Sequence, residues 1–242
     1  MSASVHIGTS GWNYKHWQGR FYPGKFPAQH MLEFYSRHFN TVELNNSFYQ
    51  LPTFESFRTW RKTAPADFVF AVKGSRFITH LKKLKSPKTS TKKFFTRVKH
   101  LEDQLGLILF QLPPLWTIDI GRSSVFLERL PDKYRYAFEF RDPSWFTDQI
   151  YELLKQHHAA LCVYHMSGYN SPAEITADFV YLRLHGVEST YGGSYSKSQL
   201  RLWARRIRAW RDDGKAVFVY FNNDPEAHAV YNAKALRDRS PS

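Results

Sequence analysis

Short apolar runs recur along the chain, and between them apolar residues return at helical spacing. Eight of these runs have the length and the branched or aromatic composition of β-strands. They are Val5 to Thr9, Thr41 to Asn45, Phe68 to Lys73, Leu107 to Gln111, Tyr136 to Arg141, Leu161 to His165, Phe179 to His185 and Val217 to Asn222. The pattern predicts eight strands with room for a helix after most of them.

The intervening segments carry the spacing of amphipathic helices. The clearest has one apolar face and one arginine face; the apolar face holds Leu200, Trp203, Ile207 and Trp210, and the other holds Arg201, Arg205 and Arg208. Further helices are expected within residues 31–38, 54–61, 92–102, 123–130, 147–157 and 226–236. Residues 74–90 are predicted to form the longest segment without regular structure.

Strand and helix thus alternate in units that average about 30 residues, the size of a strand with its crossover helix. The predicted fold is α/β, a single TIM-like (β/α)₈ barrel domain over residues 1–242. The alternative is an open doubly wound sheet. Such a sheet usually has a glycine-rich phosphate loop after its first strand, and Gly8-Thr9-Ser10-Gly11 matches that loop poorly.

Alternation along the strands places polar residues on the inward-facing parity, mostly at the C-terminal strand ends. The inward set is Glu43, Asn45, Lys73, Gln111, Glu139, Arg141, His165, Arg183, His185 and Asn222, whereas Cys162 is expected to face outward into the core. Barrel enzymes mount catalytic groups at that rim, so a ligand or catalytic site is predicted there. The alternative is a buried ion network that serves only the fold.

The inward set also suggests chemistry. Glu43 and Glu139 would act as acid and base or ligate a divalent metal together with Asp224, and His185 would shuttle protons. No His-Glu-x-x-His spacing identifies a metal, and no organic cofactor is indicated. Three inward cations against two carboxylates favour an anionic ligand. The residues expected to hold it are Lys73, Arg76, Arg141 and Arg183, those expected to orient it are Asn45, Gln111, Asn222 and Asn223, and Trp12, Tyr49 and Trp145 would offer stacking surfaces.

Composition adds a positive charge that is local rather than general. The chain has 34 Lys and Arg against 21 Asp and Glu, a net charge of +13. Residues 73–99 and 201–211 hold basic residues and no acidic ones, and the rest of the chain is close to neutral. Such patches attract polyanions, including nucleic acid, although a solvated surface is the alternative.

Other features of the sequence bear on the cellular location of the protein. The longest apolar runs are far shorter than the roughly 20 residues of a membrane helix, so no span is expected. The first residues do not resemble a signal peptide, and a single cysteine allows no intramolecular disulfide. A cytoplasmic protein is expected; its oligomeric state is not indicated.

Taken together, the motifs resemble those of the domain of unknown function 72 family, the YecE-like proteins. The resemblance rests on segments that run nearly end to end: Ile7-Gly8-Thr9-Ser10-Gly11-Trp12, Asn46-Ser47-Phe48-Tyr49, Phe70-Ala71-Val72-Lys73, Ile78-Thr79-His80, Leu109 to Pro114, Phe138-Glu139-Phe140-Arg141, Tyr181 to Gly186 and Tyr220 to Asp224. It implies a TIM-like barrel, supplies no activity, and adds His80 to the substrate-binding candidates. His165 and Ala227 depart from the expected pattern, Ala227 standing in place of a glycine.

The leading hypothesis is an enzyme with a polar site at the C-terminal barrel mouth. It would act, by hydrolysis, on an anionic substrate that bears phosphate or derives from nucleic acid. A second hypothesis is a carbohydrate-active enzyme in which the paired carboxylates cleave a glycosidic bond. A third is a non-catalytic nucleic-acid-binding module that uses the basic segments.

Overall fold

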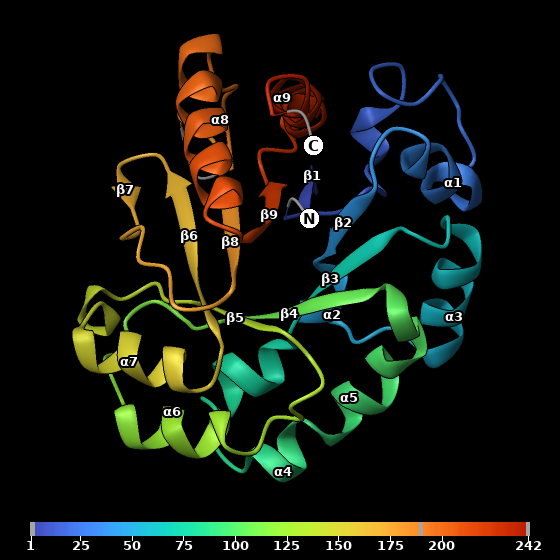
Figure 1. Ribbon diagram of the computed structural model, residues 1–242. Helices are drawn as coiled ribbons and strands as arrows, with labels where there is room; N and C mark the ends of the chain where they lie inside the picture. Colours follow the sequence, from blue (N-terminus) through green and yellow to red (C-terminus); the bar gives the residue numbers. More distant parts are fainter. Residues whose placement is uncertain (1–2, 189–190, 241–242) are drawn as a thin grey trace.

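A computed structural model describes residues 3–188 and 191–240. Eight parallel strands form the centre of the molecule (Figure 1). They are β1 (Val5–Thr9), β2 (Thr41–Leu44), β3 (Val69–Lys73), β4 (Leu105–Gln111), β5 (Tyr136–Glu139), β6 (Ala160–Met166), β8 (Phe179–Leu184) and β9 (Ala216–Phe221). Each expected strand is present, within two residues of its expected ends. A two-residue strand that the sequence did not predict, β7 (Tyr169–Asn170), pairs antiparallel with β6.

The strands follow one another around a nearly closed barrel in the order β1-β9-β8-β6-β5-β4-β3-β2. Each neighbouring pair in this order is parallel, as in Arg183 of β8 opposite Tyr220 of β9 and Gln111 of β4 opposite Glu139 of β5. The helices lie around the strands in Figure 1. The predicted TIM-like (β/α)₈ barrel is therefore confirmed, and the open doubly wound alternative is not.

Most helices fall where the apolar spacing predicted them, but two four-residue helices, Asn46–Tyr49 and Pro87–Ser90, were not predicted. The helices are α1 (Met31–Ser36), α2 (Asn46–Tyr49), α3 (Phe54–Thr63), α4 (Pro87–Ser90), α5 (Lys92–Val98), α6 (Ile120–Leu127), α7 (Asp148–Gln156), α8 (Lys197–Asp212) and α9 (His228–Arg237). Residues 74–90 differ from the expectation, because they contain α4 and a π-helical turn, Phe77–Leu81. None of the helices described is long and apolar enough to cross a membrane.

Helix α8 shows how the sequence sets these boundaries. Ser196 and Gln199 form a capping box that satisfies two backbone N–H groups at its N-terminus. Leu200, Trp203 and Ile207 are buried against the barrel, as the spacing predicts for the apolar face. The arginines of the opposite face lie at the surface.

The barrel seam lies between β1 and β2, where Ser10 and Glu43 form an isolated parallel bridge in place of a ladder. The Tyr35 hydroxyl, from α1, spans this seam because it accepts from Thr9 N at 3.0 Å and lies 3.1 Å from Thr41 O, to which it donates. Gly8 allows the close approach, since a Cβ there would lie 2.3 Å from Thr41 O. A single side chain thus completes the backbone hydrogen bonding where the sheet closes.

Candidate active site at the barrel mouth

Arg183 of β8 is the centre of a buried charge network inside the barrel. Its Nη2 donates to Glu43 Oε1 of β2 at 2.8 Å, and its Nη1 donates to Glu139 Oε2 of β5 at 2.6 Å. Arg183 is 1% exposed and both carboxylates are fully buried. The guanidinium therefore occupies the space between the two carboxylates, which alternation along three separate strands had placed on the interior side.

Glu43 has further donors besides Arg183. Ser10 Oγ donates to its Oε1 at 2.7 Å, and the hydroxyl of Tyr181 donates to its Oε2. Burial and the Glu43 charge raise the pKa of Tyr181 well above its usual value, so this hydroxyl keeps its proton. Each carboxylate oxygen of Glu43 is thus engaged within the protein.

Glu139 is held in a similar way. Arg141 donates to its Oε1, Arg183 donates to its Oε2, and the Cys162 thiol lies 3.8 Å from Oε2. Burial alone would raise the pKa of this carboxyl, but Arg141 and Arg183 outweigh it and bring the pKa well below its usual range. Glu139 is therefore ionised at neutral pH.

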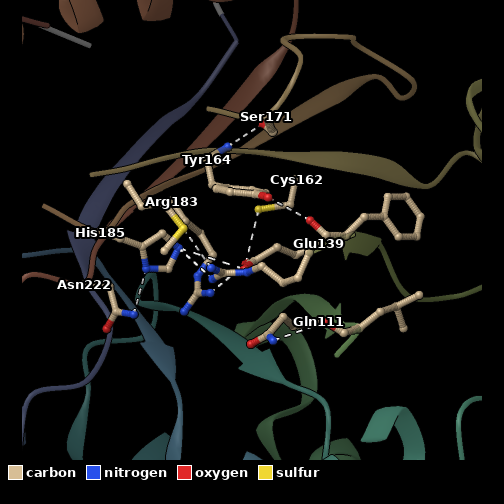
Figure 2. A network of polar contacts seen from close by, with 12 residues as sticks. Gln111, Glu139, Cys162, Tyr164, Ser171, Arg183, His185 and Asn222 are labelled. Atoms are coloured by element: carbon tan, nitrogen blue, oxygen red, sulfur yellow. Dashed lines mark hydrogen bonds and ion pairs between the residues drawn. The ribbon is translucent and has the colours of Figure 1, made fainter. Parts of the chain in front are cut away.

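His185 follows β8 and faces the same network (Figure 2). Its Nε2 lies 3.2 Å from Arg141 Nη2, and the side-chain amide of Asn222 lies 3.1 Å from its Nδ1. Burial and the charge of Arg183 bring the pKa of His185 well below its usual value, so the ring is neutral at pH 7. Because a guanidinium can only donate, Nε2 accepts and the ring proton lies on Nδ1, which donates to Asn222 when that amide turns its oxygen toward the ring.

Lys73, the last residue of β3, lies near these charges but has no carboxylate partner of its own among the described residues. In the described parts of the chain, no carboxylate oxygen lies within 4.0 Å of its Nζ, which sits 4.2 Å from the ring centroid of Phe48. The residue is 8% exposed. Burial and the nearby Arg183 lower the pKa of Lys73 to about 8, against the opposing effect of Glu139 and Glu43.

A short helical turn sets the position of the ring beside Lys73. Ser47 Oγ donates to the carbonyl oxygen of Lys73 at 2.6 Å, which fixes α2 on the end of β3. The next residue in α2, Phe48, then lies over the ammonium and also packs edge-on against His80 at 4.9 Å. Burial and the charges of Lys73 and Arg76 lower the pKa of His80 to about 4, so His80 adds no charge near neutral pH.

A cavity of 350 Å³ opens beside the network at the C-terminal ends of β4, β5 and β6. It is lined by Gln111, Pro114, Arg141, Pro143, Tyr164, Met166, Tyr169 and Tyr191. Gln111 and Arg141 were predicted to contact substrate, and both lie on its wall. Arg141 joins the cavity to the network, because it also contacts Glu139 and His185.

Several predicted site residues lie elsewhere. Trp12 packs edge-on against Trp60 of α3, and Trp145 stacks on Phe140 and donates to the carbonyl oxygen of Trp116. Asn223 is fully buried and holds Gly193 and Asn232 through its amide. The first two side chains are packed against other rings and the third acts within the fold, so none offers a contact surface at the cavity.

Asn45, Tyr49 and Arg76 belong to the rim. Asn45 immediately precedes α2, and its buried Oδ1 has no hydrogen-bond partner in the described structure. Tyr49 is 74% exposed, and Arg76 is also exposed at the start of the π-helical turn. None of the three lines the cavity.

The expected orientation of β6 was wrong by one residue. Cys162 and Tyr164 stand opposite Tyr181 and Arg183 of β8, so they face the interior, and His165 faces outward. His165 instead lies 2.8 Å from the Tyr195 hydroxyl and packs near Trp203 of α8. The run from Leu161 to Tyr164 is apolar or aromatic throughout, so alternation alone did not define its inner face.

The interior tyrosines and Met166 were missed as site residues. Tyr181 precedes Arg183 by two positions on β8, so the parity that identified Arg183 would also have identified it, whereas Tyr164 of β6 is placed opposite Arg183 only by the strand register. Met166 contacts Arg141, whose Nη1 lies 3.0 Å from its sulfur. It continues the inner face of β6, which the sequence assigned to the other parity.

The donor set for a metal is not assembled in residues 3–188 and 191–240, where no three His, Cys, Asp or Glu side chains come together in a way that would hold an ion. Glu43 and Glu139 have Arg183 between them. Asp224, the third expected ligand, lies 3.4 Å from His16 in the first loop. The residues present therefore fit an ion network better than a metal site.

Comparisons with known proteins find relatives among proteins of unknown function. A family model described as "Protein of unknown function DUF72" matches residues 6–241. UPF0759 protein YunF of Bacillus subtilis (strain 168) is 28% identical, over 96% of this chain and 93% of its own. UPF0759 protein YecE of Escherichia coli (strain K12) is 31% identical, over 59% of this chain and 50% of its own.

Solved structures give the same result. The crystal structure of a DUF72 family protein from Thermotoga maritima MSB8 matches with a TM-score of 0.87 and 28% identity, over 97% of this chain and 98% of that one. The crystal structure of a DUF72 family protein from Enterococcus faecalis V583 matches with a TM-score of 0.78 and 17% identity, over 98% and 95% of the two chains. The second likeness concerns the fold alone.

Proposed function

The chain belongs to the DUF72 family of proteins of unknown function, and we propose that its barrel mouth is the site of an enzyme that acts on a small anionic substrate. The charge balance of the mouth carries this proposal. The charges of Glu43 and Glu139 balance those of Arg183 and Arg141, and the positive charge of Lys73 has no negative charge to balance it. A phosphate-bearing or nucleic-acid-derived anion would supply the missing charge.

The cavity supports the proposal with groups suited to such a ligand. Arg141 would contact the anion directly from the cavity wall, and the Gln111 amide would orient it. Tyr164 and Tyr191 offer ring faces on the same wall. Glu43 and Glu139 take a different part from the one the sequence suggested: both are buried and ion-paired, so they would position the cations rather than transfer protons.

Hydrolysis, the reaction predicted from the sequence, would need a base to activate water. The neutral His185 ring is the nearest candidate, but Arg141 donates to its Nε2. A bound anion would compete for Arg141 and release that nitrogen. Proton shuttling by His185 thus stays a prediction that depends on an occupied cavity.

The carbohydrate-active alternative fits less well. A two-carboxylate glycosidase places its substrate between the two carboxyl groups. Here the Arg183 guanidinium fills that position and contacts both Glu43 and Glu139. A sugar would have to displace a fully buried, doubly paired arginine.

The proposal is tested by titrating the protein with inorganic sulfate, which mimics phosphate and keeps its charge between pH 6 and 10. We expect Lys73→Met to weaken binding about 10- to 100-fold, because a charge-assisted hydrogen bond contributes about 1.5–3 kcal/mol. Methionine keeps the apolar stem and leaves no carboxylate unpaired. Lys88→Met, which removes an exposed charge from the same basic segment, is the matched control.

The pH dependence provides a second measurement. The pKa of Lys73 is about 8, so the ammonium is present below that pH and is lost as the pH rises through it. Sulfate affinity of the native protein should therefore fall above about pH 8, and the affinity of Lys73→Met should not. Equal affinity of the native protein and Lys73→Met at pH 7 would contradict the proposal.

A further inference from the structure

Lys73 differs from the other cations of the mouth in chemistry as well as in pairing. A guanidinium stays protonated, whereas a lysine can release its proton and become a nucleophile. Among the described residues, the Lys73 ammonium has no hydrogen-bond acceptor and no carboxylate partner that would hold the proton in place. Arg141 and Arg183 are each fixed on Glu139.

Both the element and the surroundings suit a reacting amine. Lys73 is the final residue of β3, so a rigid strand presents its side chain at the C-terminal mouth, where barrel enzymes mount catalytic groups. Phe48 covers one side of the amine and removes it from water. The charged groups near it are Arg183, Glu139, Glu43 and Arg141, with His80 neutral beside Phe48.

We propose that Lys73 forms an imine with an aldehyde or ketone group of the anionic substrate. The proposal rests on the proposed function, because the anion is what would bring the carbonyl to the amine. It narrows the substrate class to anionic carbonyl compounds, such as 2-oxo acids and phosphorylated aldehydes or ketones.

The step balances without any further reactant. The neutral Lys73 Nζ attacks the carbonyl carbon, a C–N bond forms, and one proton passes from the nitrogen to the carbonyl oxygen to give a neutral carbinolamine. The carbinolamine hydroxyl then takes a second proton, which comes from solvent, and leaves as water while nitrogen forms the double bond, which gives the protonated imine. No group is oxidised or reduced.

Two observations bear on how readily this would occur. Burial and Arg183 lower the pKa of Lys73 to about 8, so a substantial fraction is free amine at neutral pH, against on the order of one in a thousand for an unperturbed lysine. Asn45 follows β2 beside the end of β3, and its buried Oδ1 lacks a donor. That oxygen would accept a hydrogen bond from the carbinolamine hydroxyl.

The test is reductive trapping on the full chain. Glyoxylate, pyruvate and pyridoxal 5′-phosphate are each added with cyanoborohydride, and the modified lysines are identified by mass spectrometry of peptides. We expect saturable modification of Lys73 ahead of the exposed lysines, a rate that rises through about pH 8, and inhibition by sulfate. Lys73→Arg should lose this adduct, and Lys88→Arg should keep it.

The arginine variant also separates this proposal from the previous one. Lys73→Arg keeps the positive charge, so it should still bind sulfate within a few-fold of the native protein while forming no adduct. Sulfate binding by the native protein with modification spread over exposed lysines and none at Lys73 would overturn the imine and leave anion binding intact. Absence of sulfate binding would overturn the proposed function itself. Unfolding curves establish that both variants fold.

Discussion

Arg183 is the residue on which the interior charges depend. Glu43, Glu139 and Arg183 lie on three separate strands, and alternation predicted that all three face inward. It did not predict whether they would bind a ligand or each other, because that depends on distances across the barrel. In the structure they bind each other, and the free charge lies on Lys73.

Replacing Arg183 by methionine would leave two buried carboxylates short of a donor. We expect the free energy of unfolding to fall by about 3–5 kcal/mol, the usual cost of breaking a buried ion pair from one side. Urea unfolding monitored by tryptophan fluorescence measures it. Arg201→Met, at an exposed position of α8, should change stability by no more than about 0.5 kcal/mol. A loss as small at Arg183 would show that the network does not stabilise the fold.

At the scale of elements, the sequence was most informative where polar residues mark a strand's inner face. Glu43 and Glu139 mark β2 and β5, and the expected parity is found there. Strand β6 lacks such a mark within the barrel, and its inner face becomes clear only from its register with β8. The path of the loops could not be predicted from the sequence either. Trp12 and Trp145 were therefore expected to contact substrate, although both pack into the fold.

The structure explains why a glycine is expected at position 227. Ala227 stands where a glycine was expected, and it adopts φ 59° immediately before α9. This is the left-handed region, which glycine enters without strain. The expected glycine therefore reflects the backbone turn into α9 rather than contact with a ligand.

The two basic segments belong to different elements, and this separates their possible roles. Lys82, Lys83 and Lys85 are exposed between the π-helical turn and α4. Helix α8, which carries the second segment, lies across the barrel from α4 in Figure 1. A ligand that enters the mouth near the C-terminal end of β3 would meet the first basic segment, residues 73–99. Nucleic-acid binding by either segment stays a prediction.

Charge reversal at each basic segment tests whether that segment binds nucleic acid. If single-stranded nucleic acid binds at the first segment, Lys82, Lys83 and Lys85 changed together to glutamate should weaken binding and reduce its dependence on salt, because fewer counterions are released. The same change at Arg201, Arg205 and Arg208 is the matched control for net charge. Fluorescence anisotropy at several salt concentrations measures both. Unchanged affinity in the lysine variant would contradict binding there.

For the whole molecule, the sequence predicted the number and order of strands but not how the barrel closes. Closure depends on a side chain from α1, because the Tyr35 hydroxyl takes the place of a backbone partner for both Thr9 and Thr41. Nothing in the local pattern around Tyr35 distinguishes it from other buried tyrosines. Only the seam in three dimensions gives it this role.

Tyr35→Phe removes that hydroxyl and keeps the ring. We expect a loss of about 1–3 kcal/mol in the free energy of unfolding, since a buried N–H and a buried carbonyl lose a partner. Hydrogen exchange at Thr9 should accelerate in the same variant. Tyr134→Phe is the matched control, because no hydrogen bond of the Tyr134 hydroxyl is found in the described structure. A stable variant with unchanged exchange would mean that the seam closes without Tyr35.

During translation, β1 leaves the ribosome long before β9, the strand with which it pairs along its whole length. Until then, the hydrogen bonds that link it to β2 in the described residues are those of the Ser10–Glu43 bridge and of the Tyr35 hydroxyl. Arg183 also emerges late, so Glu43 and Glu139 await their shared cation. The growing chain thus keeps open sheet edges, and a Glu43 without its cation, until its final quarter or so is made, so we expect barrel formation to be a late event during which nascent intermediates would depend on chaperone protection.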